Sequence, residues 1–69
     1  MVMTIGQAIR KARIERKFSQ HFLAHKSGLA QAAISFWEND KREPSVAHLI
    51  LLADALCISL DELVGRERR

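Results

Sequence analysis

The sequence has few of the residues that build covalent or metal-bound scaffolds. Its 69 residues include a single cysteine, Cys57, which excludes an internal disulfide and a multi-cysteine zinc site. One cysteine and no signal-peptide pattern favour a reducing, cytoplasmic setting. The longest run of large apolar residues, 49–52, is far shorter than the roughly 20 residues of a membrane span. We therefore expect a domain stabilised by apolar packing, with no membrane partner.

Strand patterns and enzyme-like constellations are missing as well. Proline occurs once, tyrosine is absent, and nowhere do apolar and polar residues alternate for the length of a strand. His21 and His25 are four residues apart but have no third ligand nearby, so we expect no metal and no cofactor. The chain has no set of nucleophile, base and orienting residue and no glycine-rich phosphate loop. We predict that the protein is not an enzyme.

Helix signals divide the chain into five segments. Thr4 is an N-cap candidate with Gln7 in the capping-box position, and Ser19, Ser45 and Ser59 are further N-cap candidates at later helix starts. The predicted helices are about 5–16, 20–27, 31–38, 46–56 and 60–64. The second and third are joined by only about three residues, so they cross steeply, as in a helix-turn-helix. We expect one all-α domain over 1–69, with its core at 4–65 and a basic tail at 66–69.

Positive charge is modestly in excess. Eleven Lys and Arg against eight Asp and Glu give a net charge of +3, and five basic residues fall between positions 10 and 17. This fits a polyanionic partner such as DNA. A solvated helix face and a frayed tail explain the charge equally well, so charge alone does not decide the function.

An ordered set of residues resembles a known family. The set is Ile5-Gly6, Ile9, Arg13, Ser19-Gln20, Leu23-Ala24, Gly28, Ile34-Ser35, Trp37-Glu38, Lys41, Pro44-Ser45, Leu49, Ala53, Leu56 and 60–63. It is similar to the Cro and lambda-repressor-like helix-turn-helix family, also called the XRE family. The resemblance implies a compact five-helix domain that binds double-stranded DNA sequence-specifically. It further implies a small transcription regulator, such as a repressor, an autoregulator or a restriction-modification controller, that binds a palindromic operator as a homodimer.

The resemblance places base recognition on the third helix. Gln31, Ala32 and Phe36 match the base-reading positions of similar repressors, and Ser35 lies beside them. A glutamine can pair with adenine, and Ala32 and Phe36 suit contact with a thymine methyl group. Phe36 is alternatively an ordinary exposed aromatic or one buried in a dimer.

Phosphate contacts are expected outside the third helix. Gln20 begins the second helix, where backbone amides and the positive dipole end favour an anion. Asn39, Lys41 and Arg42 follow the third helix, and the family positions matching Gln20, Asn39 and Lys41 contact the DNA backbone.

A partly buried ion pair is expected to anchor the third helix. In relatives, an Arg on the first helix pairs with a Glu at the end of the recognition helix, and Arg13 and Glu38 match these positions. We expect a bond between them, with Arg13 also contacting a phosphate. On the sequence alone, Glu38→Gln should weaken DNA binding with little loss of fold.

The last two helices carry a candidate dimer surface. Leu51 occupies a position that is often polar in relatives, and with Ile50, Leu60 and Val64 it could form an exposed apolar patch. A dimer formed there would set two recognition helices about one DNA turn apart. The same residues are alternatively the filled core of a monomer.

Several positions depart from the family pattern. Ala30 stands where relatives have a capping Ser or Thr, and the loss of such an N-cap lowers stability by about 1 kcal/mol. Lys17, Asp40 and Cys57 stand where relatives often carry Gly, so strained turns are expected. Cys57 itself is expected to be a small buried side chain.

The competing class is a protein-interaction module on the same fold, such as a partner-binding antitoxin domain. The sequence also leaves room for a separate regulatory protein as partner.

Overall fold

The computed structural model describes residues 3–64, and over that range it contains five α-helices and no strand. The helices are α1 (Ile5–Glu15), α2 (Gln20–Ser27), α3 (Gln31–Glu38), α4 (Val46–Leu56) and α5 (Leu60–Leu63). The all-α prediction is confirmed. The first and last helices end one residue earlier than predicted because Arg16 and Val64 are the C-cap residues. The tail at 66–69 and the predicted last core residue, Gly65, lie outside the described residues.

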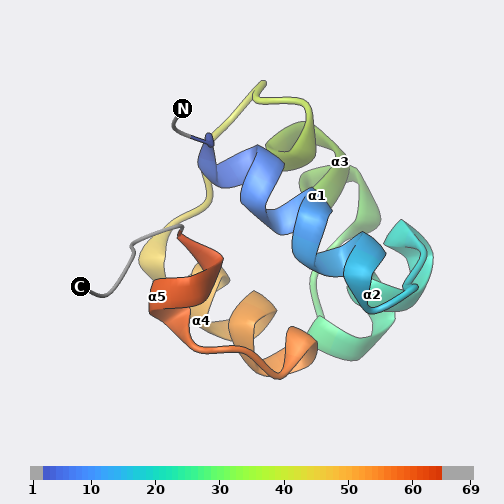
Figure 1. Cartoon of the computed structure of the whole chain (residues 1–69). Helices are drawn as coiled ribbons and strands as arrows, with labels where there is room; N and C mark the ends of the chain where they lie inside the picture. The colour runs from blue at the N-terminus through green and yellow to red at the C-terminus, as the bar shows by residue number, and fades with distance from the viewer. Residues whose placement is uncertain (1–2, 65–69) are drawn as a thin grey trace.

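The helices surround one core. In Figure 1, α1 runs between the pair α2 and α3 and the pair α4 and α5, and it packs against α3, α4 and α5. Every helix contributes at least one fully buried apolar side chain; these are Ile9, Leu23, Ile34, Leu52, Leu56 and Leu63. None of the helices between residues 3 and 64 is long and apolar enough to cross a membrane.

Side-chain caps explain where four of the helices begin. Thr4 and Gln7 close the predicted capping box of α1, with both hydrogen bonds at 3.0 Å. The N-cap of α4 was predicted but its partner was not: His48 Nδ1 accepts from the backbone N–H of Ser45 at 3.3 Å. The exception is α3, because Ala30 at its N-cap makes no side-chain hydrogen bond.

Three non-glycine residues occupy left-handed turns. Lys17, Asp40 and Cys57 have φ angles of 62°, 59° and 59°. Strained turns were predicted at these three positions, because relatives often carry Gly there. The prediction that Cys57 is buried is wrong: its thiol is exposed. Cys57 is the C-cap of α4, where the chain turns, and the next residue, Ile58, packs against the core instead.

Gly6 lets α1 and α3 approach closely. A Cβ atom built on Gly6 would overlap the backbone carbonyl oxygen of Trp37. Any other residue at this position forces the end of α3 away from α1, so Gly6 helps to set where α3 lies.

Candidate nucleic-acid interface

The two sides of α3 have different environments. Ile34 is fully buried, and Trp37 and Glu38 are 5% and 6% exposed. Gln31 and Ala32 are exposed, Ser35 is half-buried, and Phe36 is 46% exposed. The four predicted base-contact residues therefore lie on the part of α3 that the core does not use.

A cluster of three polar residues holds the buried side of α3. The carboxylate of Glu38 accepts from Arg13 Nε at 2.7 Å and from Arg13 Nη2 at 3.0 Å, which is a bidentate ion pair. It also accepts from Gln20 Nε2 at 3.0 Å. The side chains of Arg13 and Glu38 are only 12% and 2% exposed. The cluster thus joins α1, the first residue of α2 and the last residue of α3.

These bonds restrict two of the predicted phosphate contacts. Arg13 Nη1 donates to the carbonyl oxygen of Phe18 at 2.8 Å, so all three guanidinium nitrogens of Arg13 are bonded to protein acceptors. The predicted bond to Glu38 is present, and it leaves one N–H on each of Nη1 and Nη2 for the predicted phosphate contact. The side-chain amide of Gln20 likewise uses one of its two N–H groups on Glu38, which leaves the other N–H and the backbone amides at the start of α2 for the role predicted for Gln20.

Three exposed polar side chains, Asn39, Lys41 and Arg42, lie near the start of the loop after α3 (39–45), and the first of them is restrained by a hydrogen bond. Asn39 Nδ2 donates to the carbonyl oxygen of Ser35 at 2.9 Å. Lys41 and Arg42 are exposed and make no side-chain hydrogen bond or ion pair with any residue in the range 3–64. The Arg42 guanidinium carbon lies 5.6 Å from the ring centroid of Phe36, within cation–π range.

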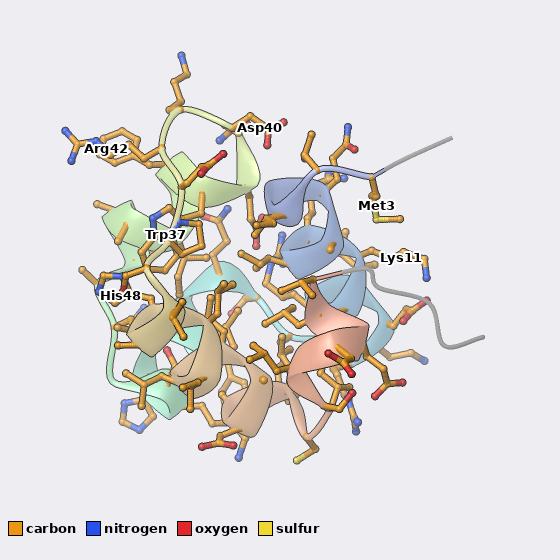
Figure 2. All side chains as sticks on the ribbon, turned by 90° about the vertical axis from the view of Figure 1, so that its left-hand side faces the viewer. Met3, Lys11, Trp37, Asp40, Arg42 and His48 are labelled. Atoms are coloured by element: carbon orange, nitrogen blue, oxygen red, sulfur yellow. The ribbon has the colours of Figure 1, made fainter. Side chains whose placement is uncertain are left out.

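An open hollow of about 400 Å³ separates this loop and α3 from the start of α4. The rings of Trp37 and His48 meet there, with centroids 4.9 Å apart. Figure 2 shows Arg42, Trp37 and His48 on one side of the molecule and Lys11 on the opposite side. No group of three or more His, Cys, Asp or Glu within the described range could hold a metal ion.

Sequence reasoning missed the structural roles of three residues. Gly6 was recognised only as part of the family pattern, although a glycine within a helical pattern is itself a signal of close packing. The bond from Gln20 to Glu38 had no local signal, because a glutamine at a helix start is expected for other reasons. The capping box of α4 had none either, because histidine is not the usual residue at its third position.

The short turn between α2 and α3, the exposed outer side of α3 and its polar anchor define a helix-turn-helix domain. Comparison with known proteins agrees: the model of the family described as "Helix-turn-helix" matches residues 9–63. The chain belongs to this family, in its Cro and lambda-repressor-like branch, whose members are DNA-binding transcription regulators and not enzymes.

Two curated relatives are a repressor and a transcriptional regulator. The chain is 40% identical over 65 residues to the immunity repressor protein of Bacillus phage phi105, covering 94% of this chain and 45% of the relative. It is 31% identical over 61 residues to the transcriptional regulator AnsR of Bacillus subtilis, covering 88% of this chain and 53% of AnsR. The chain thus spans about half the length of these relatives.

Solved structures of similar chains include two determined with DNA. The P22 c2 repressor in complex with a synthetic operator superposes with a TM-score of 0.85 at 33% identity, covering 96% of this chain and 100% of that one. The biofilm regulator SinR in complex with DNA gives a TM-score of 0.83 at 33% identity, covering 87% and 97%. The restriction-modification controller C.AhdI of Aeromonas hydrophila gives 0.83 at 36% identity, covering 86% and 89%.

Proposed function

We propose that this chain is a cytoplasmic transcription regulator that binds operator DNA sequence-specifically by placing α3 in the major groove. The observation that carries the proposal is the division of α3 described above. Its inner side is held by the buried side chains of Ile34 and Trp37 and by the bidentate pair of Glu38 with Arg13. Gln31 and Phe36 are exposed and do not belong to the core. A short helix held rigidly with an exposed outer side is the geometry with which such domains read base edges.

The similar proteins support this role. The structures of the P22 c2 repressor and of SinR were determined with DNA, and the immunity repressor of phage phi105 is a repressor by name. Each of these proteins is similar to this chain over most of the chain's length. We therefore assign base contacts to Gln31, Ala32, Ser35 and Phe36. Phosphate contacts are assigned to Lys41, Asn39, Arg42, Arg13 and the start of α2.

Salt dependence of binding tests the proposal directly. Binding of fluorescent duplexes is measured by anisotropy over a series of salt concentrations. If each subunit neutralises about three to five phosphates, the logarithm of the binding constant should fall with the logarithm of salt with a slope of about −3 to −4.5 per subunit. No binding to any duplex at low salt would overturn the proposal.

Two alanine variants locate the interface. Lys41→Ala should weaken binding to all sequences and reduce the salt slope by about 1. The matched control is Lys11→Ala, which removes one positive charge on the opposite side of the molecule. Lys11 pairs with Glu15 on α1 at 3.0 Å and should have little effect, because exposed pairs of this kind contribute less than about 1 kcal/mol. Equal losses for the two variants would contradict the placement of DNA against α3.

We further propose a two-fold dimer formed by α4 and α5. Ile50, Leu51 and Leu60 are 46%, 43% and 37% exposed, and Val46 on the same helix as Ile50 is 66% exposed. Val64 is half-buried and packs against the core, so it would contribute least. An isologous contact through these side chains would match a palindromic operator. Sedimentation equilibrium measures the dimer, and a chain that stays monomeric with DNA as well as without would refute it.

The alternative is a partner-binding module on the same fold. The exposed ring of Phe36 favours it, and SinR has been solved as a complex with the SinI protein. The salt series separates the two functions, because a partner-binding module shows no duplex binding at low salt.

A further inference from the structure

Arg42 differs from the other exposed cations near α3 in how it is held. Its guanidinium carbon lies 5.6 Å from the ring centroid of Phe36, and Phe36 is on the outer side of α3. A free arginine side chain loses about 2 kcal/mol of rotamer entropy when a ligand immobilises it. Because the ring of Phe36 already restricts Arg42, part of this loss occurs before DNA is bound.

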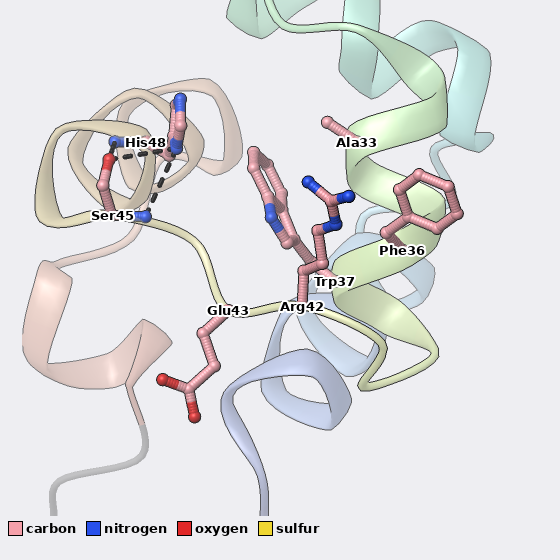
Figure 3. A pocket seen from close by; sticks show the side chains of 7 residues that line it. All are labelled: Ala33, Phe36, Trp37, Arg42, Glu43, Ser45 and His48. Carbon is pink, nitrogen blue, oxygen red and sulfur yellow. Dashed lines mark hydrogen bonds between the residues drawn. The ribbon is translucent and has the colours of Figure 1, made fainter.

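The hydrogen-bonding groups of Arg42 are unengaged. Within residues 3–64 no hydrogen bond or ion pair involves its guanidinium group. The nearest acidic residue in sequence is Glu43, and Figure 3 shows its carboxylate turned away from Arg42 and from the rings of Trp37 and His48. The guanidinium therefore presents its N–H groups to whatever enters beside Phe36.

The position of the guanidinium favours a base edge over a phosphate. Arg42 folds back against α3 and lines the hollow beside Ala33 and Phe36, which a contact with the DNA backbone alone would not require. If α3 lies in the major groove, the ring of Phe36 lies there as well, and the guanidinium of Arg42 beside that ring is in the groove too. Guanine O6 and N7 are the acceptors there that match the two parallel N–H groups of a guanidinium.

We propose that Arg42 is a specificity-determining residue that reads a guanine adjacent to the base pair contacted by Phe36, with the ring of Phe36 as its platform. This rests on the proposed DNA-binding function and refines it: the phosphate contact assigned to Arg42 above is replaced by a base contact, and the other phosphate contacts stay as assigned. In this arrangement the loop after α3 contributes one base contact to the half-site.

The experiment first selects the preferred site of the wild-type protein from a random duplex library. Affinities of wild type, Arg42→Ala, Arg42→Lys, Phe36→Leu and Lys41→Ala are then measured on that site and on all its single-base variants. We expect one guanine position at which the wild type discriminates roughly 5- to 150-fold, and at which Arg42→Ala does not discriminate. Arg42→Lys keeps the charge but lacks the bidentate fork, so it should lose most of the discrimination. Phe36→Leu should reduce it.

Two results would overturn the inference. If Arg42→Ala weakens binding by the same factor on every site, as expected for Lys41→Ala, Arg42 is a phosphate contact. If Phe36→Leu leaves the guanine preference intact, the ring is not the platform. A wild-type protein that selects no site and binds no duplex overturns the proposed function itself, and that result differs from both. Circular dichroism should be unchanged in the Arg42 variants, because this side chain is exposed.

Discussion

Replacing Glu38 with glutamine should cost this domain a large part of its stability. The carboxylate accepts three hydrogen bonds, from Arg13 Nε, Arg13 Nη2 and Gln20 Nε2, and its side chain is 2% exposed. A glutamine has one acceptor oxygen, so its amide nitrogen must face a donor, and the buried guanidinium loses its counter-ion. Removing one member of a buried ion pair costs about 3–5 kcal/mol, and the retained oxygen reduces this to about 2–4 kcal/mol.

That loss is severe for a chain of this size. At about 0.05–0.15 kcal/mol per residue, a domain of 69 residues is stable by about 3–10 kcal/mol. Each kcal/mol lowers the Tm of so small a domain by about 4–8 °C, so Glu38→Gln should lower it by roughly 8–30 °C. The sequence alone indicated little loss of fold, because it indicated a partly buried pair and not a Glu38 side chain that is 2% exposed and accepts from three donors. A Tm within 3 °C of wild type would refute this account.

A double variant separates stability from orientation. Arg13→Met combined with Glu38→Leu removes both charges, and replacement of a buried pair by apolar residues is often neutral or stabilising. The half-buried amide of Gln20 can then bind water. We expect a stable domain with weaker operator binding, because the bonds that tie the end of α3 to α1 are gone. Anisotropy titrations at 10 °C compare the folded variants. Wild-type affinity in the double variant would show that the ion pair does not position α3.

Four further substitutions test other features. Gly6→Ala should lower stability by about 1–3 kcal/mol, because its Cβ collides with the backbone of Trp37; an unchanged urea midpoint would contradict the close contact. Ala30→Ser should raise stability by about 1 kcal/mol by supplying the missing N-cap of α3, and the absence of a rise in Tm would count against it. Cys57→Gly should stabilise by about 0.5–1 kcal/mol, since it relieves a left-handed conformation at an exposed side chain; denaturant unfolding under reducing conditions measures it, and a loss of stability would show that the thiol packs usefully. Ile50→Glu should abolish dimer formation in sedimentation equilibrium while the circular dichroism spectrum stays that of a folded helical domain, whereas an intact dimer would place the interface elsewhere.

Local signals in the sequence were sufficient for the helices. Thr4, Ser19, Ser45 and Ser59 are N-caps as predicted, and such short-range patterns can be recognised without knowledge of the fold. The family pattern included Ile34, which is fully buried, and the resemblance placed base recognition on Gln31 and its neighbours.

Contacts between distant residues were much less accessible. The pair of Arg13 with Glu38 came from resemblance to a family, and local patterns alone would not have found two residues 25 positions apart. The bond from Gln20 to the same carboxylate, 18 positions away, was missed altogether. Cys57 was expected to be buried because a free cysteine usually behaves as a small buried hydrophobe. The backbone turns into a left-handed conformation at this residue, and such a turn cannot be read from hydrophobicity.

The separation of the two sides of α3 has a consequence for how such domains diversify. Because the core uses Ile34 and Trp37 and the anchor uses Glu38, mutations at Gln31, Ala32 and Phe36 leave folding almost untouched. Binding specificity can therefore change during evolution through intermediates that all fold. In protein engineering, these outer side chains can be replaced together. The polar cluster of Arg13, Gln20 and Glu38 must stay unchanged in each such variant, because it holds α3 in position.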